Sequence, residues 1–342
     1  MSIDAQDKLI PVIKRPDGKA IKSRGTPLTC IADILQWEDE LRVDLFGKKR
    51  DAGTRLNELW FRGTPSVHYS LAPGIYRDTF TDWAERVDDE WLFGALPALK
   101  DKRNITPDEK RLVREHKRLN LERDMMLTFE RECGTLMQYT FEQELYFLAR
   151  HHGMPSRLLD WSSNPLVALF MCVFPEPKRP PRDEAVKPKM KERPEPDGAI
   201  YAMNPEELNP APDDYIFHQH DQKVRMSIEV VTKWIDPYTE SSADEQQLPS
   251  SILPIRPHTL AGRIERQQSR FTLHCYGAGP QSNDTLQARY IPKHCKEQIR
   301  GQLERIGITE FSVYHTLDRL ASDIVDRFSG SRLHALKRAK GP

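Results

Sequence analysis

The sequence predicts an α+β fold in which helices flank a mixed or antiparallel β-sheet. Helical patterns gather in the first half of the 342-residue chain, whereas most strand patterns lie in the second half. A doubly wound parallel sheet would instead alternate strands with crossover helices at regular intervals. The chain also lacks internal repeats and the sustained heptads of a coiled coil, which excludes repeat architectures.

Apolar periodicity and end signals predict the helices. Residues 27–46 carry apolar side chains close to the 3.6-residue period. Thr106, Pro107 and Glu109 suit the start of a second helix, because they can form a capping box with proline at the first helical position. The apolar seam of this helix reaches Cys133. Further helices are predicted at 141–152, 166–174, 293–306 and 317–328.

Short apolar runs bounded by turn residues predict the strands. The run Leu59–Arg62 is one, and Arg157–Trp161 is another. Asn164 and Pro165 then provide a natural N-cap and first helical residue. The helix that follows is apolar almost all round, which predicts that it is buried. The remaining predictions are strands at 198–203, 271–276 and 287–291, and a strand or loop at 308–314.

The composition shifts along the chain predict one large domain with loose segments. Residues 1–26 are expected to form a loose leader, 27–328 the domain, and 329–342 a tail. Seven of the 23 residues in 175–197 are proline and thirteen are charged, so this stretch is predicted to be a mobile insertion. A second irregular loop is expected at 236–258.

Charge and composition exclude several classes of protein. Lys and Arg number 51, as do Asp and Glu, which argues against a uniformly basic nucleic-acid coat. The sequence has no apolar run of about 18 residues and no secretory signal pattern, so no membrane association is expected. Its five cysteines include no CxxC pair, which favours reduced thiols and a cytoplasmic location.

The common catalytic and cofactor motifs are missing. The sequence contains neither glycine-rich nucleotide loop, GxGxxG or GxxxxGK[ST], and neither HExxH nor GxSxG. The pairs His151-His152 and His218-x-His220 lack a third ligand at suitable spacing, so no metal site is predicted.

Arg62, at the end of an apolar strand and next to Gly63, is the first residue that stands out. A guanidinium offers paired donors to an anion, and glycine lets a ligand approach the backbone. The alternative is an arginine that simply pairs with a carboxylate of the same domain.

The second notable segment joins two apolar elements. His152 lies on the apolar stripe of the preceding helix and is expected to be buried, whereas His151 lies off the stripe and is the better functional candidate. Arg157 and Asp160 are candidates too, although they could form a local ion pair. Trp161 is more often a core residue than a ligand platform.

Together these segments resemble the FRG domain, a family named for a Phe-Arg-Gly triplet. The residues that carry the resemblance are Phe61-Arg62-Gly63, His151, Gly153, Pro155, Arg157–Trp161, Asn164, Pro165, and a later group of Arg263, Gln267, Phe271 and Thr272. The resemblance spans roughly residues 27–325. The chain departs from the pattern at Thr64, His152 and Ser269, where glutamine, tyrosine and glycine are common. The family implies a fold unit without an assigned activity.

The order of motifs also resembles mono-ADP-ribosyltransferases of the arginine–serine–glutamate type. This resemblance implies NAD as substrate, with Arg62 holding the pyrophosphate or ribose and Ser162 steadying the nicotinamide ribose. Gln267 would contact the 2′-hydroxyl without the charge of the usual glutamate, unless Glu265 or Asp160 supplies it. His151 and Asp160 would orient the substrate. The residues expected to bind NAD are Arg62, Gly63, Arg157, Trp161 and Ser162.

Three functions therefore stay open. The first is an NAD-using ADP-ribosyltransferase-like enzyme or NAD glycohydrolase, acting as a toxin or defence effector on a protein or nucleic-acid target. The second is a non-catalytic module that uses the same cleft to read a nucleotide or a modified protein. The third is a structural protein with no small ligand. A glutamine at position 267 favours the second.

Overall fold

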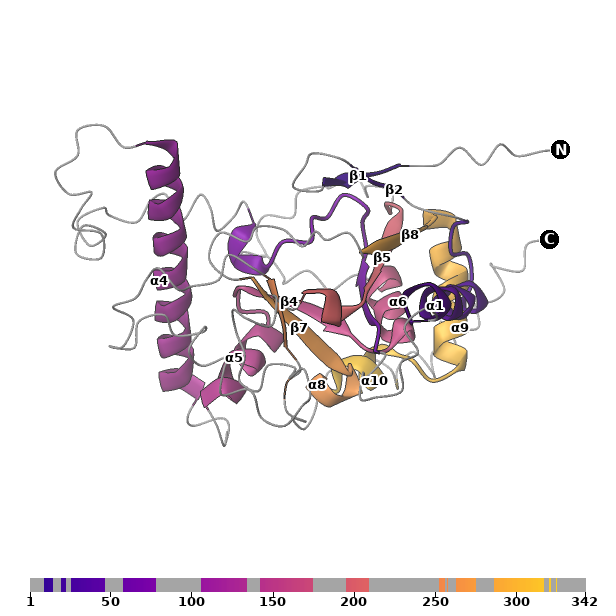
Figure 1. Ribbon diagram of the computed structural model, residues 1–342. Helices are drawn as coiled ribbons and strands as arrows, with labels where there is room; N and C mark the ends of the chain where they lie inside the picture. Colours follow the sequence, from indigo (N-terminus) through magenta and orange to yellow (C-terminus); the bar gives the residue numbers. More distant parts are fainter. Residues whose placement is uncertain are drawn as a thin grey trace, which may run out of the picture.

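The fold is described from a computed structural model of the chain (Figure 1). The structure describes the following residues: 9–14, 20–22, 26–46, 58–77, 106–133, 142–174, 195–208, 252–255, 257, 263–274, 286–316, 320 and 324. The predicted insertion lies outside the described residues from 175 to 194, and the predicted helix 317–328 lies outside them almost entirely.

A six-stranded sheet in the order β6-β7-β4-β3-β5-β8 is the centre of the molecule. All of its neighbouring strands pair antiparallel, and helices flank it, which confirms the predicted α+β class. Its strands are β3 (Trp60–Thr64), β4 (Leu158–Ser162), β5 (Gly198–Met203), β6 (Ile252–Ile255), β7 (Ser269–His274) and β8 (Gln287–Ile291).

The helices form two groups around this sheet (Figure 1). In one group α1, α6 and α9 lie together and pack against the sheet. In the other group α4 and α5 lie on the side of β4 and β7. The helices are α1 (Ile31–Phe46), α4 (Pro107–Cys133), α5 (Glu142–His151), α6 (Pro165–Val173), α8 (Arg263–Arg266), α9 (Lys296–Arg305) and α10 (Glu310–Tyr314). Single 3₁₀ turns are η1 (Gly74–Tyr76), η3 (Pro205–Leu208) and η5 (Lys293–Cys295).

Helix ends follow the predicted capping chemistry. Thr106 and Glu109 form the capping box of α4, in which the Thr106 hydroxyl accepts from the Glu109 amide at 3.3 Å and the Glu109 carboxylate accepts from the Thr106 amide at 2.9 Å. Asn164 caps α6 by accepting from the Leu166 amide at 2.9 Å, and Pro165 is the first residue of the helix.

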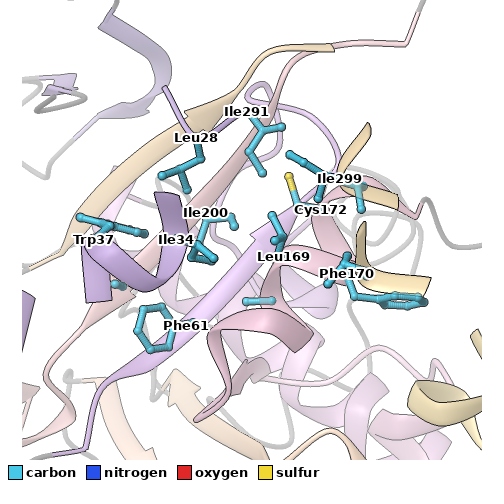
Figure 2. Packing of buried hydrophobic residues seen from close by; sticks show 14 of the residues in the cluster. Leu28, Ile34, Trp37, Phe61, Leu169, Phe170, Cys172, Ile200, Ile291 and Ile299 are labelled. Atoms are coloured by element: carbon cyan, nitrogen blue, oxygen red, sulfur yellow. The ribbon is translucent and has the colours of Figure 1, made fainter. Parts of the chain in front are cut away.

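The main core lies between the sheet and the helices α1, α6 and α9, as Figure 2 shows. Phe61 of β3 and Phe170 of α6 are fully buried in it, so α6 is buried as predicted. Gly63 lets the helix approach β3 closely, because a Cβ atom at this position would lie 1.8 Å from the Ala168 carbonyl oxygen. The glycine of the triplet is therefore required by helix–sheet packing.

Three segments differ from their predictions. The strands β1 (Leu9–Lys14) and β2 (Ala20–Lys22) pair within the predicted loose leader. Strand β6 lies within the stretch 236–258 that was predicted to be irregular. The predicted strand or loop at 308–314 is wrong for its last part, because α10 begins there after Thr309 forms a capping box with Ser312.

Candidate functional site

The two strands that carry the unusual motifs lie next to each other but barely pair. Strands β3 and β4 share a single register pair, Phe61 with Ser162. In contrast, β3 pairs with β5 over five residues, and β4 pairs with β7 over five. The ladder is therefore weakest where Arg62 and Asp160 lie, and side chains replace backbone groups there.

Strand alternation points Arg62 away from the main core. Phe61 packs with α6, and the missing side chain of Gly63 faces the same helix. Because successive side chains alternate between the two faces of a strand, Arg62 lies on the opposite face. Tyr201 is its register partner on β5 and lies on this second face, which also buries Trp60.

Arg62 and Arg150 both converge on Asp160. The Arg62 Nη1 donates to the main-chain carbonyl of Asp160 and lies 3.7 Å from its Oδ2. The Arg150 Nη2, from the last turn of α5, donates to the same Oδ2. Both arginine side chains are 14% exposed, whereas the Asp160 side chain is 35% exposed. The Asp160 side chain is therefore more exposed to solvent than either arginine side chain.

The charges of this cluster persist at neutral pH. Burial lowers the pKa of Arg62 to about 10, and the negative charge of Asp160 opposes this change. Burial would raise the pKa of Asp160, but the charges of Arg150 and Arg62 and the hydrogen bond from Arg150 hold it below its ordinary value. Asp160 is thus ionised between two cations.

Donors exceed acceptors around Asp160. The Nε atoms of Arg62 and Arg150 are buried, and neither donates a hydrogen bond to any residue that the structure describes. Arg77 adds a third positive charge, since it lies close enough to lower the pKa of Arg62. Buried donors without acceptors are rare in proteins and call for an explanation. The matching partner for this arrangement is an anion or another acceptor.

The two histidines exchange their predicted environments. His152 is exposed, whereas His151 is 8% exposed and its charge helps to lower the pKa of Asp160. The prediction that His152 is buried is wrong because α5 ends at His151, so the apolar stripe does not continue to the next residue. His151 is placed beside the Asp160 cluster.

Arg157 forms a separate, buried cluster. Its amide donates to Glu122 Oε1 at 2.7 Å and its Nε donates to Glu122 Oε2 at 2.6 Å. The Tyr146 hydroxyl donates to the same carboxylate. The local pair of Arg157 with Asp160, one alternative from the sequence, is replaced by these two distinct ion pairs.

Three further candidates contact the scaffold rather than Arg62. Trp161 is buried, and its Nε1 donates to the Thr272 hydroxyl at 3.0 Å. The Ser162 hydroxyl donates to the Gln267 carbonyl at 2.7 Å. The Gln267 side chain donates to the Val313 carbonyl at 3.3 Å, and thus faces α10. The structure brings Arg62, His151 and Asp160 together, whereas Ser162 and Gln267 form a second group.

Arg150 and Glu122 are the residues that sequence reasoning missed. Glu122 lies within the long polar helix α4, where neighbouring charges look alike, and Arg150 lies in the last turn of the short helix α5. Neither residue belongs to a short motif. A spacing signal exists for one of them: Tyr146 and Arg150 are four residues apart, so they share one face of α5. Their partners are distant in sequence and appear only in the folded chain.

Within the part of the chain that the structure describes, no three histidine, cysteine or acidic side chains converge as metal ligands. No described helix combines the length and apolar character needed to cross a membrane.

The two motif-bearing strands, β3 and β4, lie in the part of the chain that is similar to a known family. No curated protein and no solved structure matches the chain significantly. The family model of the FRG domain matches residues 57–179. This range includes Arg62, Arg150 and Asp160 and excludes Gln267. Residues 57–179 of the chain are therefore similar to the FRG domain.

Proposed function

We propose that the Arg62–Arg150–Asp160 cluster binds a phosphate-bearing nucleotide ligand, with NAD as the first candidate. The observation that carries this proposal is the convergence of two arginines from β3 and α5 on one partly exposed carboxylate. Each guanidinium retains a buried N–H without an acceptor among the described residues. Arginine forks match phosphate oxygens in shape and charge.

Cleavage of NAD, as in an ADP-ribosyltransferase-like enzyme or NAD glycohydrolase, is the second candidate. The lowered pKa of Asp160 favours it, because breaking the nicotinamide bond builds positive charge on the ribose and an ionised carboxylate stabilises that charge. Asp160 would supply the charge that Gln267 lacks. The contact of Gln267 with α10 favours binding without turnover instead.

Titration calorimetry with NAD tests the binding proposal. We expect saturable binding by the wild type, loss of at least about tenfold in affinity in Arg62→Ala, and partial recovery in Arg62→Lys, which keeps the charge but not the fork. Arg42→Ala is the matched control, since Arg42 is an exposed arginine of α1 that pairs with Glu38 on its own helix. Equal binding by wild type and Arg62→Ala would refute the proposal.

Nicotinamide release separates the two candidates. The assay uses the wild type and Arg62→Ala, each with and without cell lysate. Release that requires Arg62 would establish turnover, and a requirement for lysate would indicate a protein or nucleic-acid target, as a toxin or defence effector would have. Binding without release in either condition would establish a non-catalytic module.

A further inference from the structure

The central sheet consists of two continuous ladders that meet at one register pair. Strands β3, β5 and β8 form the first ladder, in which each neighbouring pair of strands shares five register positions. Strands β6, β7 and β4 form the second, with four positions between β6 and β7 and five between β7 and β4. Between β3 and β4 the register pair is Phe61 with Ser162. The β3–β4 junction is therefore the least paired place in the described sheet.

Each ladder has a core of its own. In the first ladder, Phe61 packs among the helices α1, α6 and α9 (Figure 2). In the second, Phe271 of β7 stacks on Phe147 of α5, with ring centroids 5.0 Å apart. A smaller cluster on the opposite face contains Trp60 and Trp161, one from each side of the junction. Much of the apolar burial of each ladder therefore does not depend on the junction, and the shared cluster keeps the two ladders in contact.

The junction is anchored at one end. Phe61 and Ser162 pair there, and Ser269 of β7 is in register with Ser162. The next residue, Arg270, donates to Oε1 of Glu58, which directly precedes Leu59 and β3, at 3.1 Å from Nε and 2.5 Å from Nη2. Beyond this end, towards Asp160, no further residues of the two described strands are in register.

Charged side chains hold the junction where register pairing is missing. Arg62 Nη1 donates to the main-chain carbonyl of Asp160, and the Asp160 carboxylate accepts from Arg150. Burial would raise the pKa of Asp160, whereas the charges of Arg150, Arg62 and His151 lower it, which places His151 in the same cluster. Because the carboxylate side chain is 35% exposed, solvent screens these ion pairs and their contribution to stability is modest.

Three buried donors at the junction have no acceptor among the described residues. They are Trp60 Nε1, Arg62 Nε and Arg150 Nε. In water each of these N–H groups would be hydrogen-bonded, so the closed junction forfeits that free energy. Access of water to the three groups recovers it, which lowers the free energy needed to part the two strands.

We propose that the β3–β4 junction is a conformational joint, at which the two strands part locally about the Phe61–Ser162 pair while both ladders stay paired. The contact of Arg62 with Asp160 keeps the joint closed, and water reaches the buried N–H groups when it opens. The inference goes beyond the proposed function, because it concerns the ligand-free protein. A chain that binds no NAD can have this joint, and a chain that binds NAD can lack it.

Hydrogen exchange of the ligand-free wild type tests the joint. Exchange is resolved to single residues by mass spectrometry and repeated at rising urea concentrations below the unfolding transition. Local opening exposes little surface, so exchange through it hardly depends on urea, whereas exchange through global unfolding accelerates steeply. We expect the amides with which β3 and β4 face each other to exchange at least about tenfold faster than those of the β3–β5 and β4–β7 ladders, with little dependence on urea. Equal rates and equal urea dependence in both groups would overturn the inference.

Variants separate the joint from a general loss of stability. In Arg62→Ala we expect the facing amides to exchange about tenfold faster than in the wild type, while the β5–β8 and β6–β7 ladders stay unchanged. Arg289→Ala is the matched control, because the Arg289 side chain is also 14% exposed and pairs with Glu40 at 3.8 Å from the edge strand β8. It should leave the junction as protected as in the wild type.

Arg62→Lys is a second variant in case Arg62→Ala does not fold. It keeps a donor of the same charge but loses the fork, so we expect a smaller rise in exchange at the junction. Exchange that accelerates equally in all strands of the Arg62 variants, or that does not accelerate at the junction, would show that Arg62 does not keep a joint closed and would overturn the inference.

Discussion

Two arginine–carboxylate clusters, one at Arg157 immediately before β4 and one at Asp160 within β4, differ in their access to solvent and in their hydrogen bonding. In the first, Glu122 accepts three hydrogen bonds from Arg157 and Tyr146, and the ion-paired side chains are only 3% and 4% exposed. In the second, three residues along, Asp160 is partly exposed and its arginine partners keep buried donors without acceptors in the described structure. We call the Glu122 cluster saturated, because its carboxylate accepts three hydrogen bonds and is buried. We call the Asp160 cluster open, because its carboxylate is partly exposed and its arginines keep donors without acceptors in the described structure.

This difference distinguishes a cluster that holds the scaffold together from the proposed binding site. The Glu122 cluster joins α4, α5 and β4, and burial together with the charge of Glu122 raises the pKa of Tyr146, so Tyr146 stays a neutral donor. A buried polar network in which every hydrogen bond is satisfied holds the elements that it joins in one fixed arrangement. The Asp160 cluster holds charges in excess of what it pairs, which is typical of functional sites.

The largest expected effect breaks the saturated cluster. Glu122→Ala leaves Arg157 buried without its partner, which typically costs about 3–5 kcal/mol of the free energy of unfolding. Urea unfolding followed by circular dichroism measures this loss. Glu132→Ala is the matched control, because Glu132 is an exposed residue of the same helix. If Glu122→Ala is no less stable than the control, the Glu122 cluster is not part of the scaffold.

The next largest effect on stability is expected at Gly63. Within the Phe-Arg-Gly triplet, Gly63 has a packing role and Arg62 the proposed binding role. In Gly63→Ala the new Cβ would collide with the Ala168 carbonyl of α6, and overpacking against backbone of this kind costs about 1–3 kcal/mol. We expect a lower melting temperature and, in the protein that stays folded, unchanged NAD affinity. A stable Gly63→Ala variant with weakened NAD binding would instead place the glycine in the binding site.

Local signals explain why most elements could be predicted. Capping residues at Thr106 and Asn164 and the apolar character of α6 act over a few residues, so sequence alone reveals them. Helix α10 was not predicted from the sequence. Its capping box pairs Thr309 with Ser312 in place of the usual glutamate or glutamine, and the helix is only five residues long. The strand β6 contains proline, which weakens any strand pattern.

The candidate site was predictable only in part, because residues distant in sequence determine how its charged side chains pair. The sequence Arg157-Leu158-Leu159-Asp160 offers two charged residues of equal promise. Their distant partners, Glu122 for one and Arg62 with Arg150 for the other, determine that the first is buried in the scaffold and the second faces solvent. No local pattern contains that information.

A smaller effect on stability is expected at the open cluster. Arg62→Ala leaves Arg150 bound to Asp160, so we expect a loss of about 1–2 kcal/mol, clearly less than for Glu122→Ala. Thermal unfolding of the two variants side by side gives the comparison. Should Arg62→Ala destabilise the protein as much as Glu122→Ala does, Arg62 would be a scaffold residue and the contrast between the clusters would fail.

The smallest effect is the acid response of Asp160. Because the folded state holds its pKa below the ordinary value of 3.8, the ionised carboxylate stabilises the fold above about pH 4, and this stabilisation is lost as pH falls through the folded pKa. Solvent screening keeps the contribution below about 1 kcal/mol. The stability difference between wild type and Asp160→Asn should therefore be constant near neutral pH and shrink below about pH 4. The lowered pKa of Asp33 affects both proteins equally and cancels in this difference. A difference that does not change with pH would mean that Asp160 acts through its shape and hydrogen bonds alone, and the charge that distinguishes the open cluster would contribute nothing to folding.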